Sequence, residues 1–285
     1  MTATRMADIG PAEIAEARAR FPDAFGSWRR DAAAAGVAAL ALGYLLWSFA
    51  YFEFDKLFNA SDRVLRLIAG FFVWQDMAGW SYAQIYVGIA QTLAMAFLGT
   101  LLASAVALVI AFGGARNTMP AALPRHAVRR GLDVLRGVDS LIWALVFVRA
   151  VGLGPLAGVL AIFVSDAGTL AKLYAEAIEN IDRKQVEGVR ATGADGPRVI
   201  RYAYLPQIFP VFLSLSLYSF ESSVRSATIL GIVGAGGIGM VLVERFRAGL
   251  YDQVAFVVLN VLICVAVIDW LSARIRARFI GQERA

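Results

Sequence analysis

The sequence has almost none of the residues that a metal site or a disulfide framework needs. Among 285 residues there is one cysteine, Cys264, which lies inside an apolar run, and one histidine, His126, which lies in a basic stretch. A single cysteine cannot build a disulfide framework. A lone histidine without cysteine or histidine neighbours does not match the spacing of zinc sites. We therefore expect neither a disulfide nor a metal site in this chain.

Charged residues are also scarce, at 17% of the chain, whereas 59% of the residues are hydrophobic and the mean hydropathy is +0.64. Soluble domains are about 45–50% apolar. The excess apolar surface indicates that a lipid bilayer is the solvent of this chain. The formal net charge of +5 is no argument for a nucleic-acid partner, because the positions of the basic residues matter more than their sum.

Several apolar runs are long enough to cross a membrane as helices, which takes about 20 residues for roughly 30 Å of hydrocarbon. The runs are residues 32–52, 86–113, 202–220 and 253–273. The apolar stretch 140–171 is interrupted by Gly152-Leu-Gly-Pro155, and glycine and proline at this spacing end one helix and start another. It predicts a short helix over residues 138–151 and a second over 155–173. The expected fold class is an all-α integral membrane protein with about six transmembrane helices.

The basic residues predict the orientation, since lysine and arginine concentrate in cytoplasmic segments. Twenty of the 27 lie in segments 1–33, 114–137, 172–204 and 274–284, against six in 53–84 and 224–252. Both termini are therefore predicted to be cytoplasmic. The predicted organisation is a cytoplasmic N-terminal segment at 1–33, a transmembrane domain at 34–273 and a cytoplasmic tail at 274–285.

One glycine-rich run, residues 227–243, is 17 residues long and does not fit an even number of crossings. It is predicted to be re-entrant or packed within protein. It contains the pattern G-x-G-x-x-G, but a dinucleotide site needs a strand–turn–helix unit and an acidic residue about 20 positions further on, and membrane helices leave no room for that sheet. The glycines are better explained by close helix packing or by a gate segment. The candidate gate residues are Gly231, Gly234, Gly236, Gly237 and Gly239.

The most informative motif lies in the predicted cytoplasmic loop, over Gln185–Gln207 (QVEGVRATGADGPRVIRYAYLPQ). A short helix before Gly193 should expose a mixed surface, and Gly193 and Gly196-Pro197 should break it. The loop resembles the conserved cytoplasmic loop of bacterial ABC importer permeases, in which Glu-Ala-Ala is followed at fixed spacing by glycine and Leu-Pro. The residues that this resemblance assigns to ATPase coupling, within a coupling loop at 183–206, are Glu187, Gly188, Val189, Arg190, Gly193, Leu205 and Pro206, with Gly188-Val189 standing in place of two alanines.

Three further stretches, 140–161, 172–179 and 226–239, resemble the phosphonate-importer permease family. The resemblance implies a bundle like that of type I ABC importer permeases, with a cytoplasmic coupling helix, in a bacterial inner membrane. It also implies as partners a second copy of the permease, two cytoplasmic ABC ATPase subunits and an extracytoplasmic binding protein. The implied substrate is a phosphonate or a related phosphorus oxyanion.

No catalytic residues are expected. The chain lacks the phosphate-binding pattern G-x-x-x-x-G-K-[ST], so we expect no cofactor on it and ATP with Mg on the partner ATPase.

Charged residues within spans are costly and mark candidate sites. Arg149 and Asp166 are predicted to reach similar depths in two successive antiparallel spans. They are interpreted either as a neutralising pair or as part of the translocation path, with Arg149 attracting an oxyanion. Glu221 and Arg225 are four residues apart and predict an ion pair on one helix face. Asp269 is expected to pair with the basic tail.

Three other functions compete with this interpretation. One is an ABC permease for another small solute such as methionine, since those importers share the coupling loop and a similar glycine segment. A second is an ion-coupled secondary transporter, which would show internal repeats with paired broken helices. A third is a polytopic membrane enzyme, for which one histidine in a basic loop is a poor foundation.

Overall fold

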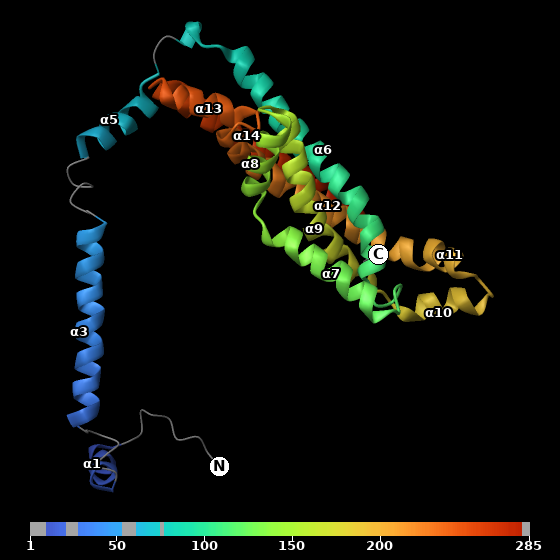
Figure 1. The fold of residues 1–285 in the computed structure, drawn as a ribbon, viewed down its shortest axis with the longest axis horizontal. Coiled ribbons are helices and arrows are strands. Elements are labelled where there is room, and N and C mark those ends of the chain that lie inside the picture. Colours follow the sequence, from blue (N-terminus) through green and yellow to red (C-terminus); the bar gives the residue numbers. More distant parts are fainter. Residues whose placement is uncertain (1–9, 21–27, 53–60, 75–76, 281–285) are drawn as a thin grey trace. The chain divides into compact units, whose positions relative to one another are not determined.

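A computed structural model describes residues 10–20, 28–52, 61–74 and 77–280 of the chain. Within these ranges the regular elements are all helical, as predicted from the sequence. The chain divides into two compact units, residues 1–66 and 67–285 (Figure 1).

The first unit contains a helix long enough to cross a membrane. Helix α1 covers Pro11–Arg20, where the sequence predicts a short helix, and α3 covers Trp28–Tyr51. The apolar part of α3, Asp31–Tyr51, is long enough to cross a membrane, and none of its most apolar window is buried inside the chain. It agrees with the predicted span at 32–52. Much of the predicted N-terminal segment 1–33 lies outside the described residues.

Helix α5, Ser61–Phe72, continues from the first unit into the second. The second unit is built on long apolar helices at the predicted positions. These are α6 (Tyr82–Gly114), α9 (Pro155–Glu179), α12 (Leu205–Leu230) and α14 (Tyr251–Ile280). Each of the four runs is long and apolar enough to span a membrane, which with α3 makes five candidate spans in the described part of the chain. The apolar helix α8, Ser140–Val151, is shorter than a full span, so five candidate spans in the described residues roughly fit the predicted number of about six.

An amphipathic helix, α7, covers Ala122–Gly137 and comes before α8 in the chain. It packs against α9. Asp139 accepts a hydrogen bond from the backbone N–H of Leu141 and so caps the start of α8. Two ion pairs fasten α7 to α9: the Nη2 of Arg129 lies 2.6 Å from Glu179, and the Nζ of Lys172 lies 2.7 Å from Asp133. The hydrogen bond from Lys172 lowers the pKa of the Asp133 carboxyl below its ordinary value.

Small residues allow α6 and α9 to pack closely along most of their length. Ala103, Ala107 and Ala111 are fully buried and lie four residues apart on α6. A Cβ atom added to Gly99 would lie 2.7 Å from Cγ2 of Ile162. Membrane helices associate through such small-residue contacts, because lipid supplies no hydrophobic drive to bring them together.

The glycine-rich run 227–243 does not form one continuous helix. Helix α12 ends at Leu230, a 3₁₀ turn covers Gly231–Val233, and helix α13 begins at Ile238 and ends at Arg247. Gly234, Gly236 and Gly237 have φ values of 95°, 81° and 74°, which favour glycine over other residues. The segment is thus a turn between two helices, packed within protein as the sequence predicts.

This turn is interlocked with the neighbouring loop between α8 and α9. The N–H of Gly154 donates to the carbonyl of Gly234 at 3.0 Å, and Pro155 lies against Gly236. On the other side, the N–H of Ile238 donates to the hydroxyl of Thr92 on α6 at 2.8 Å. The turn therefore contacts α6 and the α8–α9 loop, and a hydrogen bond to each of them pairs a backbone group of the turn.

Gly231 tests how tightly this turn is packed. A Cβ there would lie 2.6 Å from the carbonyl oxygen of Gly236 and 2.7 Å from the Cα of Gly239. Because both neighbours are backbone, Gly231→Ala should destabilise the protein by about 2–3 kcal/mol, measured by thermal unfolding in detergent. The matched control is Gly113→Ala on α6, where nothing lies within 4 Å of the added methyl; this change should be neutral or stabilise by up to about 1 kcal/mol. Equal unfolding temperatures for the two variants would contradict the tight packing described here.

Candidate functional site

The predicted coupling loop is a helix, a sharp break and a second helix that continues into α12. Helix α10 covers Arg183–Ala191, and the side chain of Asp182 caps its start by accepting from the N–H of Lys184 at 2.9 Å. Its C-terminal end is closed by the N–H of Gly193, which donates to the carbonyl of Arg190 at 2.9 Å. Gly193 has φ of 77°, a left-handed conformation that commonly ends helices. The break predicted at Gly193 is confirmed.

The second half of the loop leads directly into the bundle. Helix α11 covers Gly196–Val199, and residues Ile200–Tyr204 form a π-helical stretch before α12 begins at Leu205. Gln207 joins both halves: its Oε1 accepts from the N–H of Asp182 at 2.9 Å, and its Nε2 donates to the carbonyl of Ala203 at 2.8 Å. Single π-turns are often found at functional sites and hinges.

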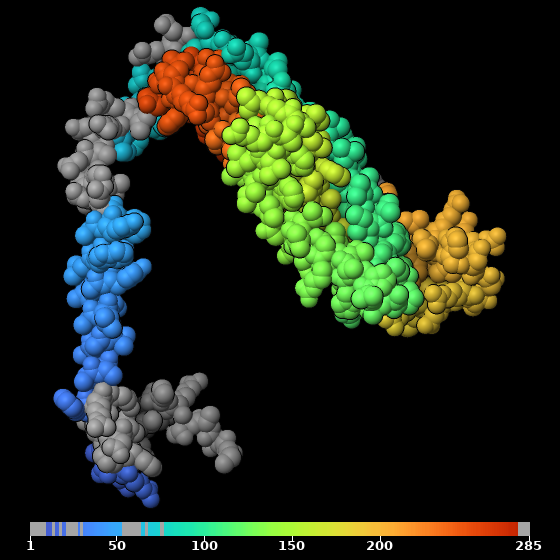
Figure 2. Space-filling view, in the orientation of Figure 1, coloured from blue at the N-terminus to red at the C-terminus, as the bar shows by residue number. Residues whose placement is uncertain are grey.

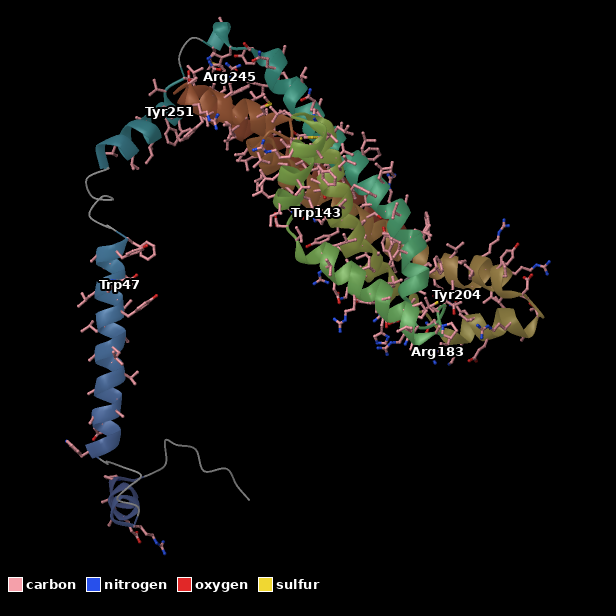
Figure 3. All side chains as sticks on the ribbon, viewed as in Figure 1. Trp47, Trp143, Arg183, Tyr204, Arg245 and Tyr251 are labelled. Atoms are coloured by element: carbon pink, nitrogen blue, oxygen red, sulfur yellow. The ribbon has the colours of Figure 1, made fainter. Side chains whose placement is uncertain are left out.

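Helices α10 and α11 project from one end of the second unit (Figure 2). Figure 3 places Arg183 and Tyr204 at this end, whereas Arg245 and Tyr251 lie at the opposite end. Val186 is buried and anchors α10, whereas Glu187, Gly188 and Arg190 are exposed.

The surface is hollowed on both sides of α10. One hollow of about 290 Å³ includes Glu187 and Arg190, and another of about 370 Å³ includes Gly188 and Gly193. An exposed helix between two hollows has the shape of a knob that fits a groove of a partner protein.

The predicted coupling residues fall into two groups in the structure. Glu187, Gly188, Val189 and Arg190 lie on α10, and Gly193 ends it. Leu205 and Pro206 instead start the membrane-length helix α12. The Leu-Pro pair therefore marks where the loop enters the bundle, and the exposed surface is made by α10.

The predicted pairing of Arg149 with Asp166 is wrong. Helix α8 ends at Val151, so Arg149 lies about 3 Å from its end, whereas Asp166 lies about 16 Å along α9 from Pro155. The two side chains are at different levels, because the loop between these helices is short. Arg149 is exposed and makes no ion pair within the described part of the chain.

Three hydroxyl groups from two other helices satisfy Asp166 instead. Its Oδ2 accepts hydrogen bonds from Thr100 of α6 at 3.2 Å, from Ser219 of α12 at 2.9 Å and from Ser223 at 2.7 Å. Sequence reasoning missed this cluster. The signal that could have revealed it is the four-residue spacing of Ser219 and Ser223, which places both hydroxyls on one face of α12.

A groove of about 670 Å³ lies between α6, α12 and α14. Its walls are almost entirely apolar. Three of the four hydroxyls that line it are already engaged, since Thr100 donates to Asp166, Ser104 donates to Ser216, and Ser216 donates to the carbonyl of Phe212; the fourth belongs to Ser272. The groove suits hydrocarbon and does not supply contacts for an oxyanion.

The candidate gate glycines lie in the interlocked turn and its flanks. Gly231, Gly236, Gly237 and Gly239 are buried, and Gly234 is partly buried. Among the described residues, no group of three or more cysteine, histidine, aspartate or glutamate side chains forms a possible metal site.

Comparison with known proteins places these features in one family. Residues 103–281 match the family model of the binding-protein-dependent transport system inner membrane component. The phosphite transport system permease protein PtxC of Stutzerimonas stutzeri is 37% identical over 257 residues, which is 89% of this chain and 91% of that protein. The putative cryptic phosphonate transport system permease protein PhnE2 of Escherichia coli K12 is 47% identical over 121 residues, which is 42% of this chain and 99% of that protein.

Methionine permeases are more distant in sequence but share the fold. The methionine import system permease protein MetP of Bacillus subtilis is 24% identical over 145 residues, 48% of this chain and 65% of that protein. An inward-facing structure of the MetNI methionine ABC transporter superposes with a TM-score of 0.60 at 20% identity, and the match covers 70% of this chain and 97% of that one. The matched region and its helical bundle show that the chain belongs to the family of binding-protein-dependent inner membrane components, the non-catalytic multi-pass permeases of ABC importers.

Proposed function

We propose that this chain forms the translocation path for a phosphorus oxyanion, a phosphonate, phosphite or phosphate, in an ATP-driven importer. The observation that carries the proposal is the exposed helix α10, which presents Glu187 and Arg190 at the spacing of the importer coupling loop. The substrate class is supported by the names of two relatives, a phosphite and a phosphonate transport permease that are 37% and 47% identical.

The partners in this proposal are a second copy of the chain, two cytoplasmic ATPase subunits that hold ATP and Mg, and an extracytoplasmic binding protein. Both termini are proposed to face the cytoplasm of the bacterial cell, because the basic residues concentrate in 1–33, 114–137, 172–204 and 274–284. In this orientation α10 points toward the cytoplasm, and the start of α6 and helix α13 face the opposite side. The predicted boundaries at residues 33 and 273 belong to this topology; α14 itself continues to Ile280.

Coupling would follow a short mechanical route. Movement of the ATPase displaces α10, and the Gln207 side chain ties the start of α10 to the π-helical stretch at 200–204. Because that stretch continues into α12, a displacement of α10 is passed to a helix that runs the length of the bundle. The π-helical stretch therefore lies on this route, and such turns are frequent at functional sites.

The coupling role is tested by the ATPase activity of the complex reconstituted with its ATPase and binding protein. In wild type, binding protein loaded with phosphonate, phosphite or phosphate should stimulate ATP hydrolysis. Glu187→Ala should remove a charged contact to the ATPase, and Gly193→Leu should strain the left-handed turn at φ of 77°. We expect each variant to lose about tenfold or more of the stimulation, since a charge-assisted contact contributes about 1.5–3 kcal/mol.

The matched control is Gly131→Leu on α7, a glycine with nothing within 4 Å of an added Cβ, which should leave stimulation unchanged. If only methionine-loaded binding protein stimulates ATP hydrolysis, the chain is still an ABC importer permease, but the proposed phosphorus substrate is wrong. A complex in which Glu187→Ala and Gly193→Leu behave like wild type would remove α10 from the coupling route.

Arg149 is proposed to attract the incoming oxyanion, since it is an exposed guanidinium in the last turn of the apolar helix α8. Its guanidinium suits the oxygens of a tetrahedral anion. Arg149→Met should lower substrate-dependent uptake about tenfold, the equivalent of one charge-assisted hydrogen bond, while the complex assembles normally. Arg149→Lys, which keeps the charge, should lose less. If the methionine variant transports at the wild-type rate, Arg149 has no part in the path.

The glycine turn at 231–239 is proposed to be a rigid part of the gate that closes the translocation path. Its backbone is held by Thr92 and by Gly154. Opening the path on that side then requires α13 and the α8–α9 loop to move together with it.

A further inference from the structure

Four charged side chains connect α12 to α14 in one cluster. The two oxygens of Glu221 are shared by two arginines: Oε1 lies 3.5 Å from Nη2 of Arg225, and Oε2 lies 3.4 Å from Nη2 of Arg276. The Nη1 of Arg225 lies 3.8 Å from Oδ2 of Asp269. The sequence predicted the pair Glu221–Arg225 correctly, but it assigned Asp269 to the basic tail instead of to Arg225.

The two carboxylates of the cluster lie well inside their helices. Glu221 is about 24 Å along α12 from Leu205 and about 13 Å from its end, and Asp269 is about 27 Å along α14 from Tyr251 and about 16 Å from its end, at 1.5 Å per residue. The two arginines lie nearer the helix ends, Arg225 about 7 Å from the end of α12 and Arg276 about 6 Å from the end of α14. All four residues belong to runs that are long and apolar enough to span a membrane.

The cluster is neither tightly paired nor covered by this chain. The side chains of Arg225 and Asp269 are 52% and 38% exposed. Ion pairs with good geometry have N–O distances of about 2.7–2.9 Å, whereas every pair here is 3.4 Å or longer. The Oδ1 atom of Asp269 is buried and accepts no hydrogen bond from the described residues.

A neutral packing cluster would show different features. Ion pairs that only hold two helices together need short distances, because the attraction between the charges must offset the cost of removing both of them from water. A half-exposed guanidinium within a membrane span faces water or a polar surface, since exposure to hydrocarbon is highly unfavourable.

We propose that Arg225 is a transient binding site for the transported oxyanion within the permease. This inference rests on the proposed function. Glu221 and Asp269 hold the guanidinium of Arg225 in place when no substrate is present. Arg276 places a second guanidinium on the carboxylate of Glu221. An incoming phosphorus oxyanion exchanges with Asp269 as a partner of Arg225 and presents the same kind of acceptor oxygens.

The loose geometry explains why such a site releases its ligand. Conduction requires binding that is favourable enough for entry and weak enough for exit. Because the carboxylates remain within 4 Å of the guanidinium, they compete with the anion and limit its residence time. Exchange of one acceptor for another leaves the guanidinium paired at every stage.

The experiment places a cysteine at position 225 in the reconstituted complex. Cys264 is the chain's single cysteine, so the parent is Cys264→Ala, and uptake of radiolabelled phosphite or phosphonate is measured from loaded binding protein. Arg225→Cys in this parent should lower uptake at least about tenfold, the loss of one charge-assisted interaction. Aminoethyl methanethiosulfonate, which adds an ammonium group, should restore much of the uptake. Sulfonatoethyl methanethiosulfonate, which adds an anion, should not restore uptake. Saturating substrate should slow the reaction of the cysteine with either reagent.

Ser222→Cys is the matched control, because it is the exposed neighbour of Glu221 on α12; its modification by either reagent should leave uptake unchanged. Arg225→Gln combined with Asp269→Asn removes both charges of one pair. If the cluster only holds the helices together, this double variant assembles and transports like the parent, which would overturn the proposal. Failure of both Arg225→Cys and the double variant to assemble would equally assign the cluster to packing and overturn it.

The outcome is separable from the proposed function. If the parent complex takes up no phosphorus oxyanion, the substrate assignment fails whatever position 225 does. If the parent takes it up and Arg225→Cys does so equally well, with no substrate protection, the assignment of Arg225 is wrong and the function stands.

Discussion

The hydrogen bond between Gly154 and Gly234 joins two stretches of irregular backbone that lie between apolar helices. In lipid every backbone N–H and C=O must find a partner inside the protein, so non-helical segments survive only where other protein shields them. The α8–α9 loop and the glycine turn meet this requirement together, with Thr92 supplying a hydroxyl to the N–H of Ile238. This contact joins the loop before α9 to the turn before α13, and both α9 and α13 pack on α6.

Polar groups inside the bundle follow two different patterns. Asp166 is held by three hydroxyls at 2.7–3.2 Å, which is the arrangement of a group whose task is to fix α6, α9 and α12 to one another. The cluster of Glu221, Arg225, Asp269 and Arg276 has long distances and a half-exposed guanidinium, which is the arrangement of a group with room for another partner. The contrast in geometry, more than the presence of charge, separates a structural site from a candidate substrate contact.

The sequence predicts the helices better than it predicts the contacts between them. Hydropathy and the Gly152-Leu-Gly-Pro155 break locate α6, α8 and α9 closely, because length and polarity decide what lipid accepts. Helices α12 and α14 start near their predicted positions but continue to Leu230 and Ile280, beyond the predicted ends at 220 and 273. Gly193 marks the end of α10, because a left-handed turn there suits glycine. The pairing of Arg149 with Asp166 fails, because Arg149 lies in the last turn of α8, next to the loop, whereas Asp166 lies near the middle of α9. The partners of Asp166 and Asp269 depend on helix rotation, which apolar composition leaves open.

Uptake of a radiolabelled phosphorus oxyanion into proteoliposomes tests the central claim most directly, with the energy source as the variable. Vesicles that contain this chain, its ATPase and its binding protein should accumulate phosphite or phosphonate only when ATP is supplied on the side of the ATPase. Collapse of ion gradients should leave that accumulation intact. Accumulation by the chain alone under a proton or sodium gradient, without ATP or the ATPase, would contradict the account and make the chain an ion-coupled transporter.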